Sequence, residues 1–275
     1  MVYKLHNKVM KKLMLKIKDR KGFSLIELSI VLVVVGIMMY GATELYSYSA
    51  EKAKIDNTNS TLDAVEKALR LYYQTNDDLP CPADGTLALD DGNFGKEDCG
   101  VSIYDDVSRG VVPTRALNLP DSYMFDAWGN RISYFVSKFC WTVGVANWTT
   151  CSSQTTLARI YDNTNNASGT DTEDSRTSRA AYVLVSYAKD GVAAWRRDGG
   201  ANRIPSTVST TAPEIDNAGV DGAGGLGAGA DGNFRDDFAR DWKGTETGSG
   251  IAGQAGTYYD DIVRWKTPEQ ISYRH

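Results

Sequence analysis

The feature that most constrains this chain is one long apolar run near its amino terminus. Residues 23–43 read FSLIELSIVLVVVGIMMYGAT, and about 20 mostly apolar residues are enough for a helix to cross the hydrocarbon core of a membrane. One carboxylate, Glu27, interrupts the run. A charged side chain inside a membrane is costly unless it has a partner, so Glu27 is predicted to have a function.

The charges on the two sides of this run differ strongly. Residues 1–22 carry eight Lys/Arg and one Asp, a net charge of +7, whereas the whole chain carries −5 and residues 23–275 therefore −12. A basic segment is typical of the cytoplasmic flank of a membrane span. The acidic remainder argues against a nucleic-acid partner, because extensive contact with phosphates requires Lys and Arg.

Two conventional interpretations of the run account for only part of it. A secretory signal peptide has an apolar core of about 7–15 residues and a small-residue cleavage site, for which Ser47-Tyr48-Ser49 is a candidate. This run is longer, and it contains Glu27. A plain signal anchor explains the length and the basic flank, but it leaves Glu27 unexplained.

A third interpretation rests on the start of the run, residues 21–28, which read KGFSLIEL. This segment resembles the leader junction of type IV pilins and type II secretion pseudopilins. In that family a prepilin peptidase cuts after the glycine, here Gly22, and methylates the new amino terminus, here Phe23. Glu27 stands where the family has its characteristic glutamate.

The resemblance implies a structural filament subunit and a set of partners. The partners are the prepilin peptidase, other pilin or pseudopilin subunits, and an inner-membrane assembly platform with its ATPase. The chain is expected in the bacterial inner membrane, with its amino terminus cytoplasmic and its head periplasmic, and then in a filament in the periplasm or at the cell surface. Glu27 of one subunit is expected to pair with the Phe23 amine of a neighbour and so set the axial register.

A second helical pattern follows the apolar run. Residues 44–75 contain no Pro or Gly, and apolar side chains recur there at spacings of three, four and seven residues, on one face of a helix. These side chains are Ile55, Leu62, Val65, Leu69 and Tyr72. One continuous helix over residues 23–75 is predicted, although an ordinary core helix after a separate anchor would show the same pattern. Pro80 and Pro82 mark its end.

The four cysteines all follow the apolar run, and none forms a C-x-x-C pair, which argues against zinc and thioredoxin-like sites. Outside the cytoplasm an even number favours disulfides. Three pairings are open, and Cys81–Cys99 with Cys140–Cys151 is favoured because each closes a short loop. Four free buried thiols are the alternative.

The carboxy-terminal part, residues 76–275, is predicted to be a globular head. A loop is expected up to about residue 110. Gly129-Asn130 predicts a turn, and residues 131–136 alternate as a strand. The turn Asp126-Ala127-Trp128-Gly129-Asn130 resembles the Asp-Pro-Trp-Gly turn of major pseudopilins, with Ala127 in place of the Pro, and it is interpreted as a structural turn with a buried Trp.

Further segments of the head are assigned from their composition. Residues 139–151 predict a strand pair or a loop closed by cysteines. Residues 152–178 are rich in Ser, Thr, Asn and Asp and predict an exposed loop, and residues 180–187 are the clearest strand.

A calcium site is expected only from the resemblance to major pseudopilins. In that family an Asp-Gly turn after the strand and a later Asp-Asp-Ile segment are joined by calcium, which here corresponds to Asp190, Asp260 and Asp261. Oxygen ligands suit calcium. A Gly/Asp-rich insert at about residues 192–257 separates the two segments in this chain, and an acidic turn without metal is the alternative.

Catalysis is not expected. The only histidines are His6, in the predicted leader, and His275, at the end of the chain, which weakens triad and zinc chemistry. There is no phosphate-binding loop with its Lys, and no carboxylate pair is singled out for glycoside hydrolysis.

The sequence therefore predicts an α+β, pilin-like fold in which a long amino-terminal helix packs on a small antiparallel sheet with long loops. Its parts are a leader of residues 1–22, a transmembrane and amphipathic helix of residues 23–75, and a head of residues 76–275. The predicted function is a filament subunit of the type IV pilus or type II secretion class. The alternative is a membrane-anchored binding protein or adhesin that does not polymerise.

Overall fold

The structure is a computed structural model of the chain, and the part it describes is discontinuous. It comprises residues 24–100, 103–104, 107–141, 148–161, 175–191, 193–200, 233–235 and 261–273. The chain divides into two compact units, Met1–Lys52 and Ala53–His275.

Helix α2 runs from Leu25 to Asn76 without interruption and belongs to both units. Its continuity agrees with the absence of Pro between these residues. The helix ends where Asp77 turns into the left-handed region at a φ of 56°, and the Asp77 amide donates to the Tyr73 carbonyl at 2.8 Å, which is a common way to close a last turn. Among the residues that the structure describes, no helix carries an apolar stretch long enough to span a membrane.

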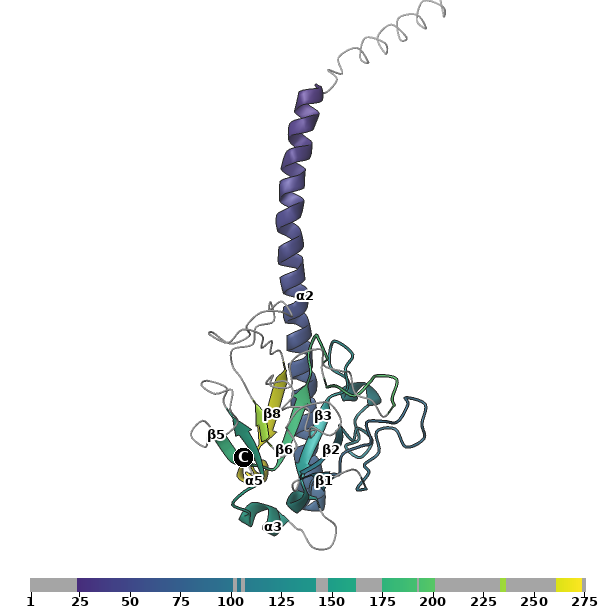
Figure 1. Cartoon of the computed structure of the whole chain (residues 1–275), viewed down its shortest axis with the longest axis vertical. Coiled ribbons are helices and arrows are strands. Elements are labelled where there is room, and N and C mark those ends of the chain that lie inside the picture. Colours follow the sequence, from purple (N-terminus) through teal and green to yellow (C-terminus); the bar gives the residue numbers. More distant parts are fainter. Residues whose placement is uncertain are drawn as a thin grey trace, which may run out of the picture. The chain divides into compact units, whose positions relative to one another are not determined.

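The main sheet of the second unit is antiparallel and has five strands in the order β1-β2-β3-β6-β8 (Figure 1). The strands are β1 (Ile103–Tyr104), β2 (Val107–Val111), β3 (Ser133–Ser137), β6 (Tyr182–Ser186) and β8 (Ile262–Lys266). The register pairs Tyr134 with Leu184 and Ser186 with Ile262. The two strands predicted most clearly from the sequence, β3 and β6, are thus direct neighbours.

Both faces of this sheet are covered. One face contributes Tyr134 and Leu184 to a core that also contains Leu62, Val65 and Leu69 of α2. The opposite face contributes its alternate residues to a second core, which includes Phe135, Val183, Val185 and Val263. Because neighbouring residues in a strand point to opposite faces, this double coverage explains why β3 and β6 are buried along their whole length.

The second core is completed by a smaller sheet that the composition did not predict. It has the order β5-β4-β7 and consists of β4 (Ala158–Tyr161), β5 (Ser175–Ala180) and β7 (Asn233–Arg235). The prediction of one exposed loop over residues 152–178 is therefore wrong, since Ala158 and Ile160 are buried against Phe234 and the main sheet. The β4–β7 pair is parallel, so the antiparallel prediction holds for the main sheet but not for this one.

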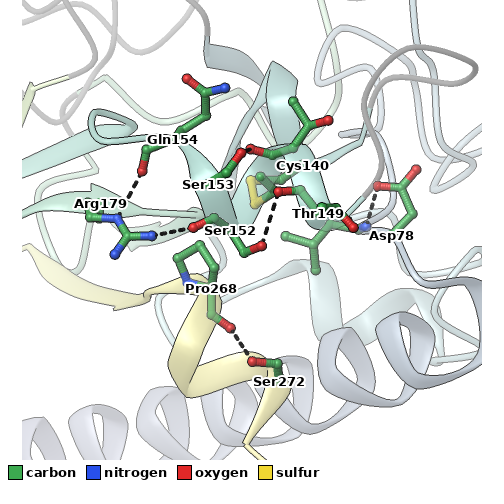
Figure 2. Close-up of a disulfide and its surroundings, with 12 residues drawn as sticks. Asp78, Cys140, Thr149, Ser152, Ser153, Gln154, Arg179, Pro268 and Ser272 are labelled. Carbon is green, nitrogen blue, oxygen red and sulfur yellow. Dashed lines mark hydrogen bonds between the residues drawn. A yellow bond between two sulfur atoms is a disulfide. The ribbon is translucent and has the colours of Figure 1, made fainter.

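Two short helical segments lie at the ends of residues 139–151, where a strand pair or a loop closed by cysteines was predicted, and residues 142–147 between them lie outside the described residues. The helical segments are η2 (Lys138–Cys140) and α3 (Trp148–Ser153), joined by the Cys140–Cys151 disulfide. Figure 2 shows Arg179 of β5 next to Ser152 and Gln154, at the end of α3, where its guanidinium donates to the carbonyls of Ser152 at 2.7 Å and Gln154 at 3.0 Å. The cation lies at the carboxyl end of the helix, where the backbone dipole favours positive charge.

The same arginine also reaches the last helix of the structure. Arg179 forms an ion pair with Glu269 at 2.7 Å, in α5 (Pro268–Ser272). Thr267 caps α5, accepting a hydrogen bond from the Gln270 amide while the Gln270 side chain accepts one from the Thr267 amide. Arg179 thereby connects β5, α3 and α5, three elements that are far apart in the sequence.

Arg131 connects a different set of loops. Its side chain is fully buried, and its guanidinium donates to the carbonyls of Gly85 at 3.0 Å, Leu87 at 2.7 Å and Arg197 at 2.9 Å. It also lies 5.1 Å from the centre of the Phe94 ring. A buried guanidinium is tolerated because these carbonyls replace the water molecules that hydrate it in solution. Through these hydrogen bonds Arg131 connects the loop at residues 84–87 to the segment at residues 195–200.

Candidate functional site

The first described residues of α2 form an apolar surface that is open to solvent in the single chain. Its large apolar side chains are Leu25, Ile26, Leu28, Ile30, Val31, Leu32, Val33, Val34, Val35, Ile37, Met38 and Met39. Their exposed fractions range from 40% at Val35 to 88% at Leu25. Residues 30–35 are consecutive, and since a helix has 3.6 residues per turn they cover its whole circumference. An exposed apolar surface of this extent marks an interaction site.

Glu27 lies in the first turn of this helix and is exposed. The first helical hydrogen bond runs from the Leu28 amide to the Ser24 carbonyl at 3.0 Å, which makes Ser24 the capping residue. Ser24 and Glu27 then have the S-x-x-E spacing of a capping box, and the helix dipole favours a carboxylate at this end. In the single chain Glu27 is thus compatible with the helix while remaining accessible to a cation from another molecule.

The processing residues Gly22 and Phe23 lie outside the described residues. Their roles therefore stay predictions from the sequence.

The head half of α2 differs from the apolar half because its partners are in the same chain. Leu62, Val65 and Leu69 have no exposed surface and belong to the core shared with the main sheet, as the helical spacing predicted. Ile55 and Tyr72, the other members of the predicted face, are partly buried against that core. The amphipathic half of the helix is therefore a structural element of the head.

The turn at residues 126–130 is held by a buried carboxylate. Asp126 accepts hydrogen bonds from the amides of Trp128 at 3.0 Å and Asn130 at 2.8 Å, and from the Ser186 hydroxyl at 2.8 Å. Burial raises the pKa of Asp126, although these hydrogen bonds oppose the shift. The buried residue of the turn is thus Asp126, while Trp128 is only partly buried, which corrects the prediction of a buried Trp.

The two head segments that resemble major pseudopilins contact each other through this turn. The Asn130 side-chain amide donates to the Ala188 carbonyl at 2.6 Å, and the Asn130 side chain packs closely against Gly191. Gly191 has a φ of 65°, which favours glycine in the Asp-Gly turn after β6. These contacts depend on β3 and β6 pairing, so sequence spacing did not reveal them.

The structure describes two of the three residues predicted to bind calcium. Asp190 lies in the turn that follows β6, and Asp261, which is 1% exposed, directly precedes β8. Because Ser186 pairs with Ile262, the topology brings the end of β6 and the start of β8 to the same edge of the sheet. Asp260 lies outside the described residues, so the calcium site stays a prediction.

Within the described ranges, the single group of three potential metal ligands lies elsewhere, at Cys81, Glu97 and Cys99. Both sulfur atoms belong to the Cys81–Cys99 disulfide. A disulfide sulfur is not a thiolate, and the thiolate is the form that binds metal. This group is therefore not a metal site in the oxidised protein.

The two disulfides are Cys81–Cys99 and Cys140–Cys151, and the structure contains no free cysteine among its described residues. These are the two pairs that the short loops favoured. Each closes a loop within the head, with sequence separations of 18 and 11 residues.

The comparisons with known proteins concern the amino-terminal segment. Residues 17–43 match the family described as the prokaryotic N-terminal methylation motif. No curated protein and no solved structure matches the chain. The matched residues contain the predicted cleavage junction, Glu27 and the apolar run.

This match indicates a type IV pilin-like or pseudopilin substrate of the prepilin peptidase, and it supports the type IV pilin and pseudopilin family. Members of that family are structural proteins rather than enzymes. The match ends at residue 43, so the likeness of the head to major pseudopilins rests on the turn and strand patterns alone.

Proposed function

We propose that this protein is a structural subunit of a type IV pilus or type II secretion pseudopilus filament. The prepilin peptidase cuts the chain after Gly22 and methylates Phe23, and residues 23–43 anchor the subunit in the inner membrane until it is assembled. The observation that carries the proposal is the methylation motif at residues 17–43, together with the exposed apolar side chains of α2 between Leu25 and Met39.

The apolar surface keeps this half of the helix out of water, both before and after assembly, in this proposal. Transfer of a fully exposed aliphatic side chain to an apolar environment is favourable by about 1.5–3 kcal/mol. Val33 is 62% exposed and Ile37 is 68% exposed in the single chain, so much of this gain is still available to them. Before assembly these side chains contact lipid, and afterwards they pack against the same helix of neighbouring subunits.

Glu27 supplies specificity rather than energy. Its carboxylate is costly in an apolar filament core unless an opposite charge meets it. Cleavage after Gly22 creates an amine on Phe23, only four residues away along the chain. Pairing Glu27 with the amine of a neighbouring subunit neutralises both charges, and only one axial register allows it.

The partners and the localisation follow from the same motif. The basic segment of residues 1–22 is held on the cytoplasmic side, and the acidic head lies in the periplasm, where its two disulfides are stable. An inner-membrane platform and its ATPase extract the subunits from the bilayer.

We further propose that calcium binds at Asp190, Asp260 and Asp261, at the edge of the sheet shared by β6 and β8.

Intact-mass spectrometry of the protein purified from membranes tests the processing step. The expected mature chain begins at N-methylated Phe23. A mature protein that keeps residues 1–22 would contradict the filament proposal and favour the alternative, a membrane-anchored binding protein that does not polymerise.

Two substitutions at the first turn separate anchoring from assembly. Glu27→Ala is expected to leave membrane insertion intact and to abolish filaments, because the neighbouring amine then lacks its partner. Ser29→Ala is the matched control, since the Ser29 hydroxyl donates only to the Ile26 carbonyl of the same helix. Normal filaments with Glu27→Ala would remove Glu27 from the mechanism.

Thermal unfolding with and without a chelator tests the calcium proposal. Chelation is expected to lower the melting temperature of the wild type, and Asp190→Ala is expected to abolish this response. An identical melting curve after chelation would contradict the site.

A further inference from the structure

The two disulfides of the head differ in how solvent reaches them. Cys140 and Cys151 are both buried, with exposed fractions of 1% and 0%. In the other disulfide Cys81 is buried at 2%, whereas Cys99 is exposed. Thiol–disulfide exchange requires a thiolate to reach one sulfur of the bond, and Cys99 is the cysteine that solvent reaches.

The surroundings of Cys140–Cys151 add to its protection. The Leu79 amide donates to the Cys140 carbonyl at 3.0 Å, and Arg179 holds the carbonyls of Ser152 and Gln154 just after Cys151 (Figure 2). Both cysteines also belong to the main hydrophobic core. A reductant reaches this bond only if that part of the core opens.

The ends of the Cys81–Cys99 loop are held independently of the sulfur atoms. Ala83 forms an antiparallel bridge with Glu97, the Asp98 amide donates to the Pro82 carbonyl at 2.8 Å, and the Glu97 carboxylate accepts a hydrogen bond from the Cys81 amide at 3.2 Å. Cleavage of the disulfide therefore leaves the two cysteines close together, so the bond can open and close again in the folded protein.

An acidic group, Glu97, lies beside this exposed disulfide. A carboxylate oxygen of Glu97 and the sulfur atoms of Cys81 and Cys99 lie within 4.8 Å of one another. Burial raises the pKa of Asp78 to about 6 and that of Tyr72 to about 12, and the Glu97 charge adds to both shifts. Since negative charge disfavours a nearby thiolate, this setting slows attack and makes the leaving sulfur a poorer leaving group.

We propose that Cys81–Cys99 is a thiol–disulfide exchange site in the folded protein, attacked at Cys99 by a dithiol reductant, whereas Cys140–Cys151 is a permanent cross-link. A thiolate of the reductant attacks the Cys99 Sγ, the bond between the two Sγ atoms breaks, and its electron pair leaves on the Cys81 Sγ, which takes a proton from solvent. The second thiol of the reductant loses its proton and attacks the mixed disulfide. This releases the Cys99 thiolate, which also takes up a proton. The protein disulfide gains two electrons, and the dithiol is oxidised to a disulfide.

Glu97 controls the rate in this proposal. Its carboxylate lies beside both the attacked and the leaving sulfur, so it opposes charge on each of them. Removing the Glu97 charge is expected to make exchange faster, because a thiolate leaves faster when nearby negative charge no longer opposes it.

Time-resolved alkylation of the full-length protein in mild detergent tests the proposal. The protein is incubated with dithiothreitol, quenched with acid and freed of the reductant, and then denatured, alkylated with N-ethylmaleimide and mapped by peptide mass spectrometry. Cys81 and Cys99 are expected to become alkylated together, while Cys140 and Cys151 stay linked unless denaturant is present during the reduction. Equal rates for the two disulfides, or reduction of Cys81–Cys99 only after denaturation, would overturn the proposal.

A monothiol identifies the attacked sulfur. Glutathione is expected to form a mixed disulfide on Cys99 and to leave Cys81 as the alkylated thiol, and the reverse pattern would contradict attack at Cys99. Glu97→Gln is expected to react faster than wild type with dithiothreitol, whereas Asp56→Asn, which removes an exposed charge on α2 outside the loop, is expected to react at the wild-type rate. An unchanged rate for Glu97→Gln would contradict its control of the exchange.

Discussion

The two halves of α2 share one continuous backbone but differ in whether their apolar side chains are buried within the chain. The head half buries Leu62, Val65 and Leu69 completely in the core of its own unit. The apolar half leaves side chains such as Leu25 and Val33 mostly exposed. A helix gains most of its stability from the packing of its apolar side chains, so the head half is stabilised within the chain, whereas the proposed function gives the apolar half lipid or neighbouring subunits as partners.

This difference also separates two kinds of substitution. A change in the apolar half is expected to act on assembly and to leave the folding of the head unaltered. A change in the buried face of the head half is expected to act on folding. Paired substitutions in the two halves distinguish these effects.

The largest effect is expected from a charge placed in the apolar half. Val33→Asp introduces a carboxylate that costs about 2.5–3.5 kcal/mol in a membrane helix, so filament yield should fall about 70- to 400-fold, as measured by shearing and electron microscopy. Leu71→Asp is the matched control, because Leu71 in the head half is 65% exposed and Val33 is 62% exposed. Equal loss of filaments in both variants would contradict the separation.

The next effect concerns the buried face of the head half. Leu62→Ala is expected to destabilise the head by about 2–5 kcal/mol, because it removes a fully buried side chain and leaves a cavity. Leu32→Ala, at a position 63% exposed in the apolar half, should leave the melting temperature of the head unchanged. Thermal unfolding of the full chain in detergent measures both, and similar losses would show that the two halves fold together.

A smaller effect is expected where the head half of α2 holds the turn of residues 126–130. Thr58 is fully buried, and its hydroxyl accepts a hydrogen bond from the Ala127 amide at 3.1 Å. Thr58→Val leaves that amide without its acceptor and should cost about 1–2 kcal/mol. Ser60→Ala is the control, since the Ser60 hydroxyl is exposed and donates only to the Asp56 carbonyl. Equal stability of Thr58→Val and wild type would show that the turn does not depend on α2.

The smallest effect is expected just beyond the end of α2, at Asp78. Its pKa is raised to about 6, mainly by burial, so between the ordinary carboxyl pKa and about 6 the folded state binds more protons than the unfolded state. Stability should therefore decrease as the pH rises through this window, from about 4 to 6. Asp78→Asn should remove this dependence and stabilise the head at pH 7 by less than about 1 kcal/mol, because Asp78 is only half-buried and solvent screens it.

Melting temperatures at pH 4.5 and pH 7 measure the Asp78 effect. In the wild type the Leu79 amide donates to the Asp78 carboxylate at 2.8 Å. The side-chain amide oxygen that Asp78→Asn introduces still offers an acceptor to the Leu79 amide, so the substitution isolates the charge. A pH dependence identical to that of the wild type would show that Asp78 does not titrate in this window.

The features that the sequence predicted well depend on local patterns. The helix, its buried face at Leu62, Val65 and Leu69, and the strands β3 and β6 each follow from spacing within a few residues. The end of α2 follows from the polar residues and prolines after Asn76. The methylation motif at residues 17–43 is equally local, which is why the proposed function rests on it.

The features that the sequence did not predict depend on residues that are far apart. The small sheet joins β4 to β7 across about 70 residues, and its strand β5 reads SRTSRA, a polar segment typical of a loop. Arg131 and Arg179 look like surface residues in the sequence, and only the fold surrounds them with backbone carbonyls. Hydrogen bonds of this kind have no periodicity that a sequence pattern reveals.

By itself, the sequence determined where this protein is apolar, where it is charged, which helix is amphipathic and which short motif leads the chain, because each of these depends on neighbouring residues. The tertiary structure decided which apolar residues find partners within the chain and which remain exposed on α2. It also decided that Cys99 is open to solvent while Cys140 and Cys151 are enclosed. The physical reason is that burial is a property of packing between distant segments, and it appears only when those segments meet.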